Sequence, residues 1–110
     1  MDKNHMIVLK IQGYAQEAMV FLGELSFEQF VQDRKTIAAC VLNLSQIGEL
    51  AAQLDSEFIQ RHSQIPWHKM RGMRNRIVHD YEGLQVNIIW DVMVLFLPDL
   101  LEQIELLKNI

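Results

Sequence analysis

Apolar residues recur at spacings of three and four along most of the chain, a pattern that predicts amphipathic helices. The first long helix should cover residues 4–23 and the second residues 33–54. A third should start around Pro66, because proline suits the first turn of a helix. Asn87 can cap a fourth, which Pro98 should kink or split. The pattern therefore predicts four long helices.

Two short helical segments are predicted between the long ones. Ser26 is placed to cap residues 27–31, with Gln29 at the capping-box position. Residues 56–62 should form another turn or two. The expected fold is an all-α, antiparallel four-helix bundle with short extra helical turns, in a single domain over residues 1–110.

The same periodicity predicts the buried positions of three helices. They are Ile7, Ile11, Tyr14, Ala18, Phe21 and Leu25 in the first; Ile37, Cys40, Leu44, Ile47, Ala51 and Leu54 in the second; and Ile88, Ile89, Val92, Leu95, Phe96, Leu100, Ile104 and Leu107 in the fourth. Small residues in the second helix, including Gly48, should let a neighbouring helix approach closely.

Composition narrows the class of protein. Half of the 110 residues are hydrophobic and only two are proline, which is typical of a packed helical domain. The lone Cys40 cannot form an internal disulfide, so a reducing cytoplasm is expected. The polar start and the absence of any apolar run of about 18 residues predict neither a signal peptide nor a membrane span.

Charge is distributed unevenly along the chain. The formal net charge is −4, yet residues 61–79 contain Arg61, Lys69, Arg71, Arg74 and Arg76 and no Asp or Glu. A basic segment in an acidic chain indicates a local site for an anion such as phosphate.

This basic segment also contains an arginine, four intervening residues and a histidine, Arg74 to His79, with Tyr81 two positions later. Arginine is a permanent cation that grips phosphate, and histidine transfers protons near neutral pH. Asn75 lies beside Arg74. These residue types are suited to cutting RNA without a metal ion.

A helical wheel places Arg74 about 40° from the centre of an apolar stripe formed by Trp67, Met70, Met73 and Ile77. We therefore expect Arg74 at the margin of a cleft or subunit interface, met by an anion, a carboxylate such as Glu49, or carbonyls. His79 lies about 140° away on a continuous helix. The two can meet one phosphate only if the helix loosens before His79 or a second subunit contributes.

Other roles for these residues remain open at this point. His79 could be a dipole partner at the helix end, and Tyr81 a packed aromatic residue. Metal ligation is not expected, because the histidines lack i, i+4 spacing and there is no paired-cysteine motif. No cofactor is expected either.

The chain closely resembles the HEPN superfamily, in particular its minimal HepT branch, over nearly its whole length. The arginine–histidine spacing alone is a weak signal, but it becomes strong when joined to Tyr81, the Pro66-Trp67 pair and the Ile47-Gly48-Glu49 segment. The other matching segments are Leu25-Ser26-Phe27-Glu28-Gln29-Phe30, Asp33, Lys35, Leu44, Ile47-Gly48-Glu49-Leu50-Ala51, Ile65-Pro66-Trp67, Gly72-Met73-Arg74-Asn75, Trp90, Leu97-Pro98 and Leu100.

This resemblance implies a homodimeric four-helix ribonuclease whose two motifs meet in one cleft. His79 would take or give the proton of a ribose 2′-hydroxyl that attacks the adjacent phosphorus, and Arg74 would stabilise the developing charge. Asn75 would orient the phosphate or His79. Three further cations would bind flanking phosphates: Lys69, Arg71 and Arg76. The products would carry 2′,3′-cyclic phosphate and 5′-hydroxyl ends, with transfer RNA or messenger RNA as the substrate.

The resemblance also implies a role as the toxin of a type VII-like toxin–antitoxin pair. Its antitoxin would be a minimal nucleotidyltransferase that transfers AMP from ATP onto Tyr81, adding bulk and negative charge beside His79. The chain departs from many relatives at Glu82, where an aromatic is common, and at Leu50, where alanine is commoner. Glu82 places an acid beside the expected RNA path.

Two competing hypotheses remain. The chain could be a noncatalytic helical partner of a nucleotidyltransferase, a role that needs neither Arg74 nor His79. It could also be a purely structural dimer, in which case Arg74→Ala would cost stability alone.

Overall fold

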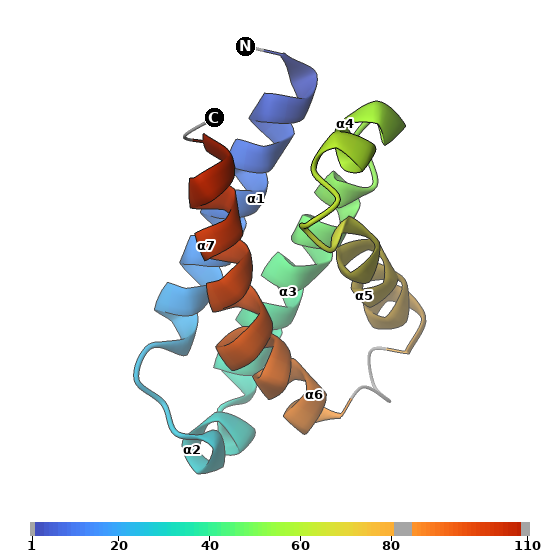
Figure 1. Ribbon diagram of the computed structural model, residues 1–110. Helices are drawn as coiled ribbons and strands as arrows, with labels where there is room; N and C mark the ends of the chain where they lie inside the picture. Colours follow the sequence, from blue (N-terminus) through green and yellow to red (C-terminus); the bar gives the residue numbers. More distant parts are fainter. Residues whose placement is uncertain (1, 81–84, 109–110) are drawn as a thin grey trace.

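The computed structural model describes residues 2–80 and 85–108, and these residues form helices without a strand (Figure 1). Four long helical passes alternate in direction: α1 (Lys3–Leu22), α3 (Arg34–Ala51), α5 (Trp67–Asp80), and a last pass made of α6 (Val86–Asp91), η2 (Val92–Phe96) and α7 (Leu97–Lys108). Short α2 (Phe27–Gln32) and α4 (Ser56–Arg61) connect the first three. The predicted all-α bundle is confirmed.

Polar side chains set several helix starts. Ser26 accepts a hydrogen bond from Gln29 N, and Gln29 returns one to Ser26 N, so the predicted capping box is present. Asp33 caps α3 instead of opening it, accepting from Thr36 N at 3.0 Å and Thr36 Oγ1 at 2.7 Å. These bonds favour the charged carboxylate and lower the pKa of Asp33.

Other boundaries differ from the sequence prediction. The second long helix ends at Ala51 instead of Leu54, because the chain tightens into a turn in which Gln53 N donates to Leu50 O. The expected cap at Asn87 is wrong. Gln85 precedes α6 in an extended conformation, and its carbonyl accepts from the amides of Ile88 and Ile89.

Helix α3 lies at the centre of the bundle, with its largest contacts to α1 and α5. Its predicted face is largely confirmed: Cys40, Leu44, Ile47 and Ala51 are buried, as is Leu54 in the turn that follows the helix. In α1 the prediction is confirmed in part, since Ile7, Ile11 and Ala18 are buried. Phe21 is instead 39% exposed, and the buried stripe also includes Val8, Ala15 and Leu22.

Pro98 coincides with a disturbance of the last helical pass. The π-helical η2 ends at Phe96, and Leu97 N donates to Val92 O, five residues back. The π-helical turn is wider than an α-helical one, and Met93 and Leu97 are buried there. The regular spacing did not predict these two buried positions. Leu95, predicted to lie in the core, is instead 68% exposed.

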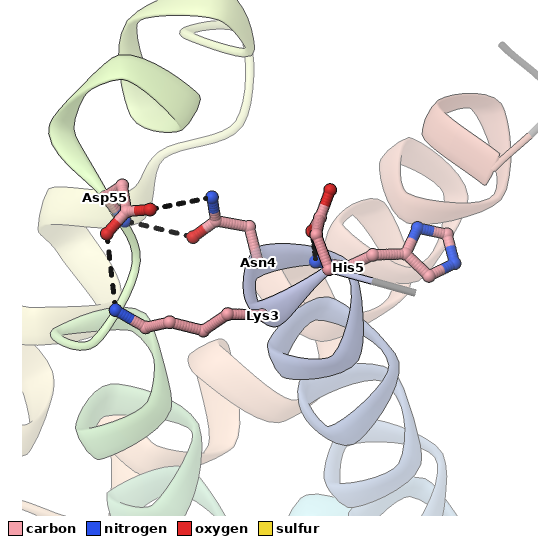
Figure 2. A network of polar contacts seen from close by, with 5 residues as sticks. Lys3, Asn4, His5 and Asp55 are labelled. Atoms are coloured by element: carbon pink, nitrogen blue, oxygen red, sulfur yellow. Dashed lines mark hydrogen bonds and ion pairs between the residues drawn. The ribbon is translucent and has the colours of Figure 1, made fainter.

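The start of α4 is tied to the start of α1 by a polar network (Figure 2). Asp55 accepts from Lys3 Nζ at 3.2 Å and from Asn4 Nδ2 at 3.1 Å, and Asp55 N donates to Asn4 Oδ1. These contacts lower the pKa of Asp55. They fix α4 beside the first turn of α1, at the end of the bundle where α7 also ends.

Candidate functional site

Buried aromatic and apolar residues anchor the first half of α5, the helix that carries the arginine–histidine motif. Trp67 and Met70 are fully buried, and the Trp67 indole N–H donates to His62 O at 3.1 Å. Pro66 stands just before the helix, and its carbonyl accepts from Lys69 N and Met70 N. The start of α5 is therefore fixed against the core.

Gly48 lets α5 lie unusually close to α3. A Cβ added at Gly48 would lie 2.6 Å from Met70 O, 3.2 Å from Arg74 Cα, and closer still to Arg74 Cβ. Any larger residue would push the two helices apart. The predicted close approach is confirmed here, and it brings Glu49, the next residue, beside Arg74.

Arg74 has two side-chain partners. Its Nε donates to Glu49 Oε1 in an ion pair, and its Nη1 donates to Asn75 Oδ1 at 2.9 Å. The side chains of Arg74 and Glu49 keep 34% and 43% of their exposure. A carboxylate thus meets Arg74, as expected, while part of the Arg74 side chain remains exposed. Asn75 holds Arg74 through this bond, and its predicted role in orienting a phosphate or His79 stays a prediction.

The backbone of α5 is helical without interruption from Trp67 to Asp80. The option that the helix loosens before His79 is therefore wrong. Register places positions 74 and 79 about 140° apart around the helix axis. Tyr81, Glu82 and Gly83 lie outside the described residues, so the predictions for them stay predictions.

The cations predicted to bind RNA do not share one face of α5. Lys69, Arg71 and Arg76 are all exposed. Lys69 and Arg76 line one groove together, since seven residues correspond to almost two full turns. Arg71 is not part of that groove, and it stands one turn before Asn75.

The groove lies between α5 and the last helical pass and has a volume of about 720 Å³. Its lining is mainly apolar, including Met73, Ile89 and the exposed Leu95. On the α5 side it carries Lys69 and Arg76, and on the other side Asp91 and Asp99. Sequence reasoning missed the groove; Pro98 was the one signal that this segment departs from a regular helix.

The described residues hold no group of three or more His, Cys, Asp or Glu side chains placed to bind a metal ion. Cys40 is buried, with its thiol 3.9 Å from Ala18 O, and burial raises its pKa to about 11. Cys40 is thus a core thiol without the ionised form that reacts or ligates.

No helix in the described part of the chain is long and apolar enough to cross a membrane.

Comparison with known proteins gives a consistent result. A family model described as ribonuclease HepT-like matches residues 11–107. A protein of Caldanaerobacter subterraneus named "putative RNase" is 38% identical, with 74% of this chain and 72% of that protein covered. A "putative RNase" of Methanocaldococcus jannaschii is 34% identical, with 82% and 75% covered.

A third relative, named "probable ribonuclease HepT", comes from Thermococcus cleftensis and is 34% identical, with 81% of each chain covered. No solved structure matches the chain significantly. The family model spans nearly the whole bundle, including the motif on α5. The chain therefore belongs to the HepT-like ribonuclease family.

Proposed function

We propose that the chain is a metal-independent endoribonuclease that uses Arg74 and His79. The observation that carries the proposal is the position of Arg74 in a chain of this ribonuclease family. Glu49 and Asn75 hold its guanidinium, and the Arg74 side chain remains about one-third exposed. A cation fixed in advance stabilises a developing negative charge without reorganising during the reaction.

The proposed reaction is transfer of the phosphoryl group within one RNA strand. His79 removes the proton of a 2′-hydroxyl, and the 2′-oxygen forms a bond to the adjacent phosphorus. The bond from phosphorus to the 5′-oxygen breaks, and this oxygen leaves with a proton. Arg74 offsets the charge on the nonbridging oxygens. One product ends in a 2′,3′-cyclic phosphate and the other in a 5′-hydroxyl.

A homodimer completes the proposed site. Because α5 is continuous, positions 74 and 79 of one chain lie about 140° apart around the helix axis. In a dimer, Arg74 of one chain and His79 of the other can approach the same phosphate. The apolar groove beside α5 suits a second copy, and its positive and negative sides can pair across a two-fold axis.

Contacts to flanking phosphates are assigned to Arg71, Lys69 and Arg76. Arg71 is exposed and does not line the groove. It therefore stays available to bind RNA when a second chain covers the groove. Lys69 and Arg76 line the groove, so they reach RNA only at the edge of the dimer cleft. Each such contact weakens as the salt concentration rises.

We further assign the chain to the cytoplasm, as the toxin of a toxin–antitoxin pair of type VII-like organisation. The antitoxin is a minimal nucleotidyltransferase that attaches AMP to Tyr81, the residue after the end of α5. The added phosphate places negative charge next to the site of the RNA phosphate. Tyr81→Phe should cleave RNA like the wild type and escape inactivation when ATP and the nucleotidyltransferase are added. Silencing of Tyr81→Phe by the partner contradicts this mechanism.

The nuclease is tested by incubating the wild type and His79→Ala with mixed cellular RNA in the presence of a metal chelator. Removing a general base should lower the cleavage rate by about 10²- to 10⁴-fold. Analysis of the fragment ends should detect 2′,3′-cyclic phosphates with the wild type. Equal cleavage by both proteins assigns the activity to another site, and no cleavage by either favours a noncatalytic partner of a nucleotidyltransferase.

A further inference from the structure

A second cavity lies at the end of the bundle where α1 begins and α4 and α7 end (Figure 1). Its volume is about 600 Å³, within the range typical of small-molecule sites. The motif lies elsewhere: position 79 is about 18 Å along α5 from Trp67, which stands at the cavity end of that helix. The ribonuclease proposal gives this cavity no role.

The cavity lining combines apolar and basic side chains. Its apolar members are Val8, Leu9, Phe58 and Leu107. The remaining lining residues are polar or basic: His5, Arg61, His62 and Gln64. Among the described residues that line the cavity, none carries a carboxylate. The nearest acid along α4 is Glu57, one turn before Arg61, and no ion pair joins the two among the described residues. Asp55, just before α4, is bound to Lys3 and Asn4 (Figure 2).

Two basic side chains of the cavity lining, Arg61 and His5, are open to a ligand. Arg61 and His5 are exposed, and neither side chain bonds to another described residue. Figure 2 shows the His5 ring directed away from the Asp55 network. An arginine without a carboxylate partner, beside two imidazoles, is a good receptor for a phosphate group.

An aromatic wall lies next to these basic groups. The rings of Phe58 and His62 have their centroids 4.6 Å apart, and Phe58 also contacts Trp67 at 5.9 Å. The Trp67 indole N–H holds the carbonyl of His62. A flat base can stack on such a wall, as bases do on aromatic side chains in single-strand binding proteins.

We propose that this cavity binds a nucleoside phosphate, with the base against Phe58 and His62 and the phosphate on Arg61 and His5. The ligand is either a free mononucleotide or one nucleotide unit of a strand held away from the cleavage site. Both ligands offer a base and a phosphate to the same residues. Neither needs to be cleaved at Arg74 and His79 in order to bind.

The test follows the four histidine ring signals by NMR during titration of the wild type. The probes are AMP, adenosine and a short single-stranded oligodeoxyribonucleotide, which lacks the 2′-hydroxyl and cannot be cleaved. Binding should shift the signals of His5 and His62. The exposed His68 lies outside the cavity lining and serves as an internal reference, while His79 reports on the motif.

Arg61→Glu should weaken AMP binding about tenfold or more, because it replaces a charge-assisted hydrogen bond by repulsion. Arg34→Glu is the matched control, since Arg34 begins α3 at the opposite end of the bundle. Loss of AMP binding in the first variant alone supports the proposal for a free mononucleotide. If the oligonucleotide binds and AMP does not, the cavity takes one nucleotide unit of a strand.

Several results would overturn the proposal. These are unmoved His5 and His62 signals, adenosine binding as tight as AMP, equal AMP affinity in wild type and Arg61→Glu, or shifts at His79 alone. If Arg61→Glu does not fold, the affinities of the wild type for AMP and adenosine are compared instead. Tighter binding of AMP supports the phosphate site, and equal binding overturns it. A failed ribonuclease assay leaves these outcomes unchanged, because none of the probes is cleaved.

Discussion

The two sides of α5 differ sharply in how they are packed. Toward α3 the helix is so close that Gly48 has no room for a Cβ, and Met70 is fully buried. Toward the last helical pass it borders a groove of about 720 Å³. Gly72 lies on that open side, where an added Cβ would meet nothing within 4 Å.

The two sides of α5 therefore have different roles. The close side fixes the guanidinium of Arg74, because Glu49 is placed by the contact between α3 and α5. The open side leaves apolar surface and opposite charges available for a second copy of the chain. In the proposed function, the site depends on the contact between α3 and α5 within one chain and on a second contact that forms on dimerisation.

Removing the cation on the close side should have the largest effect. Arg74→Ala should lower the cleavage rate by about 10²- to 10³-fold, since it removes the group that stabilises the transition state. The free energy of unfolding of this variant should fall by no more than about 1 kcal/mol, because the ion pair between Arg74 and Glu49 is partly exposed. RNA cleavage and thermal melting measure the two effects. A stability loss with unchanged cleavage assigns Arg74 a structural role.

Mixing two inactive variants sharpens this prediction. If Arg74 and His79 act from different chains, a mixture of Arg74→Ala and His79→Ala dimers that exchange subunits regains about a quarter of wild-type activity, because half of the dimers contain one intact site. If both residues act within one chain, the mixture stays inactive. Each variant alone is the control.

Filling the close contact should have the next largest effect. Gly48→Ala should lower the free energy of unfolding by about 1–3 kcal/mol, because the new methyl group collides with the backbone of α5. Gly72→Ala is the matched control on the open side and should raise stability by up to about 1 kcal/mol. Denaturant titration measures both. Equal changes in the two variants contradict the difference between the two sides.

Charging the open side should have the smallest effect on the monomer. Leu95→Glu should raise the dissociation constant of the dimer about tenfold or more, because a carboxylate would have to be desolvated in the contact. Leu95 is already 68% exposed, so the monomer should lose little stability. Sedimentation measures the dimer. Leu106→Glu, at a position 61% exposed outside the groove, is the control, and an equal loss of dimer there argues against this face.

Local rules accounted for most of the helical framework. Ser26 and Gln29 identified the start of α2, because a capping box depends on residues three apart in the chain. The strict spacing from Cys40 to Leu54 identified the buried face of α3. Prediction was poorer where a helix departs from regular geometry, and Leu95 is exposed because η2 shifts the register that the pattern assumed.

The candidate site divides in the same way. Sequence alone located Arg74 and His79 five residues apart and indicated that Arg74 needs a partner, since an unpaired buried cation is costly. It left several partners open. Only tertiary structure selected Glu49, because that contact depends on how closely α5 approaches Gly48.

The sequence by itself therefore determined the helical class and the residue types of the motif, because these follow from periodicity, capping and motif spacing. It also determined the family, through the resemblance of its segments to known relatives. The tertiary structure decided the pairing of Arg74, the continuity of α5 through position 79, and the two cavities. Those features depend on the relative placement of helices. Contacts between residues distant in the chain set that placement, and one-dimensional spacing does not encode them.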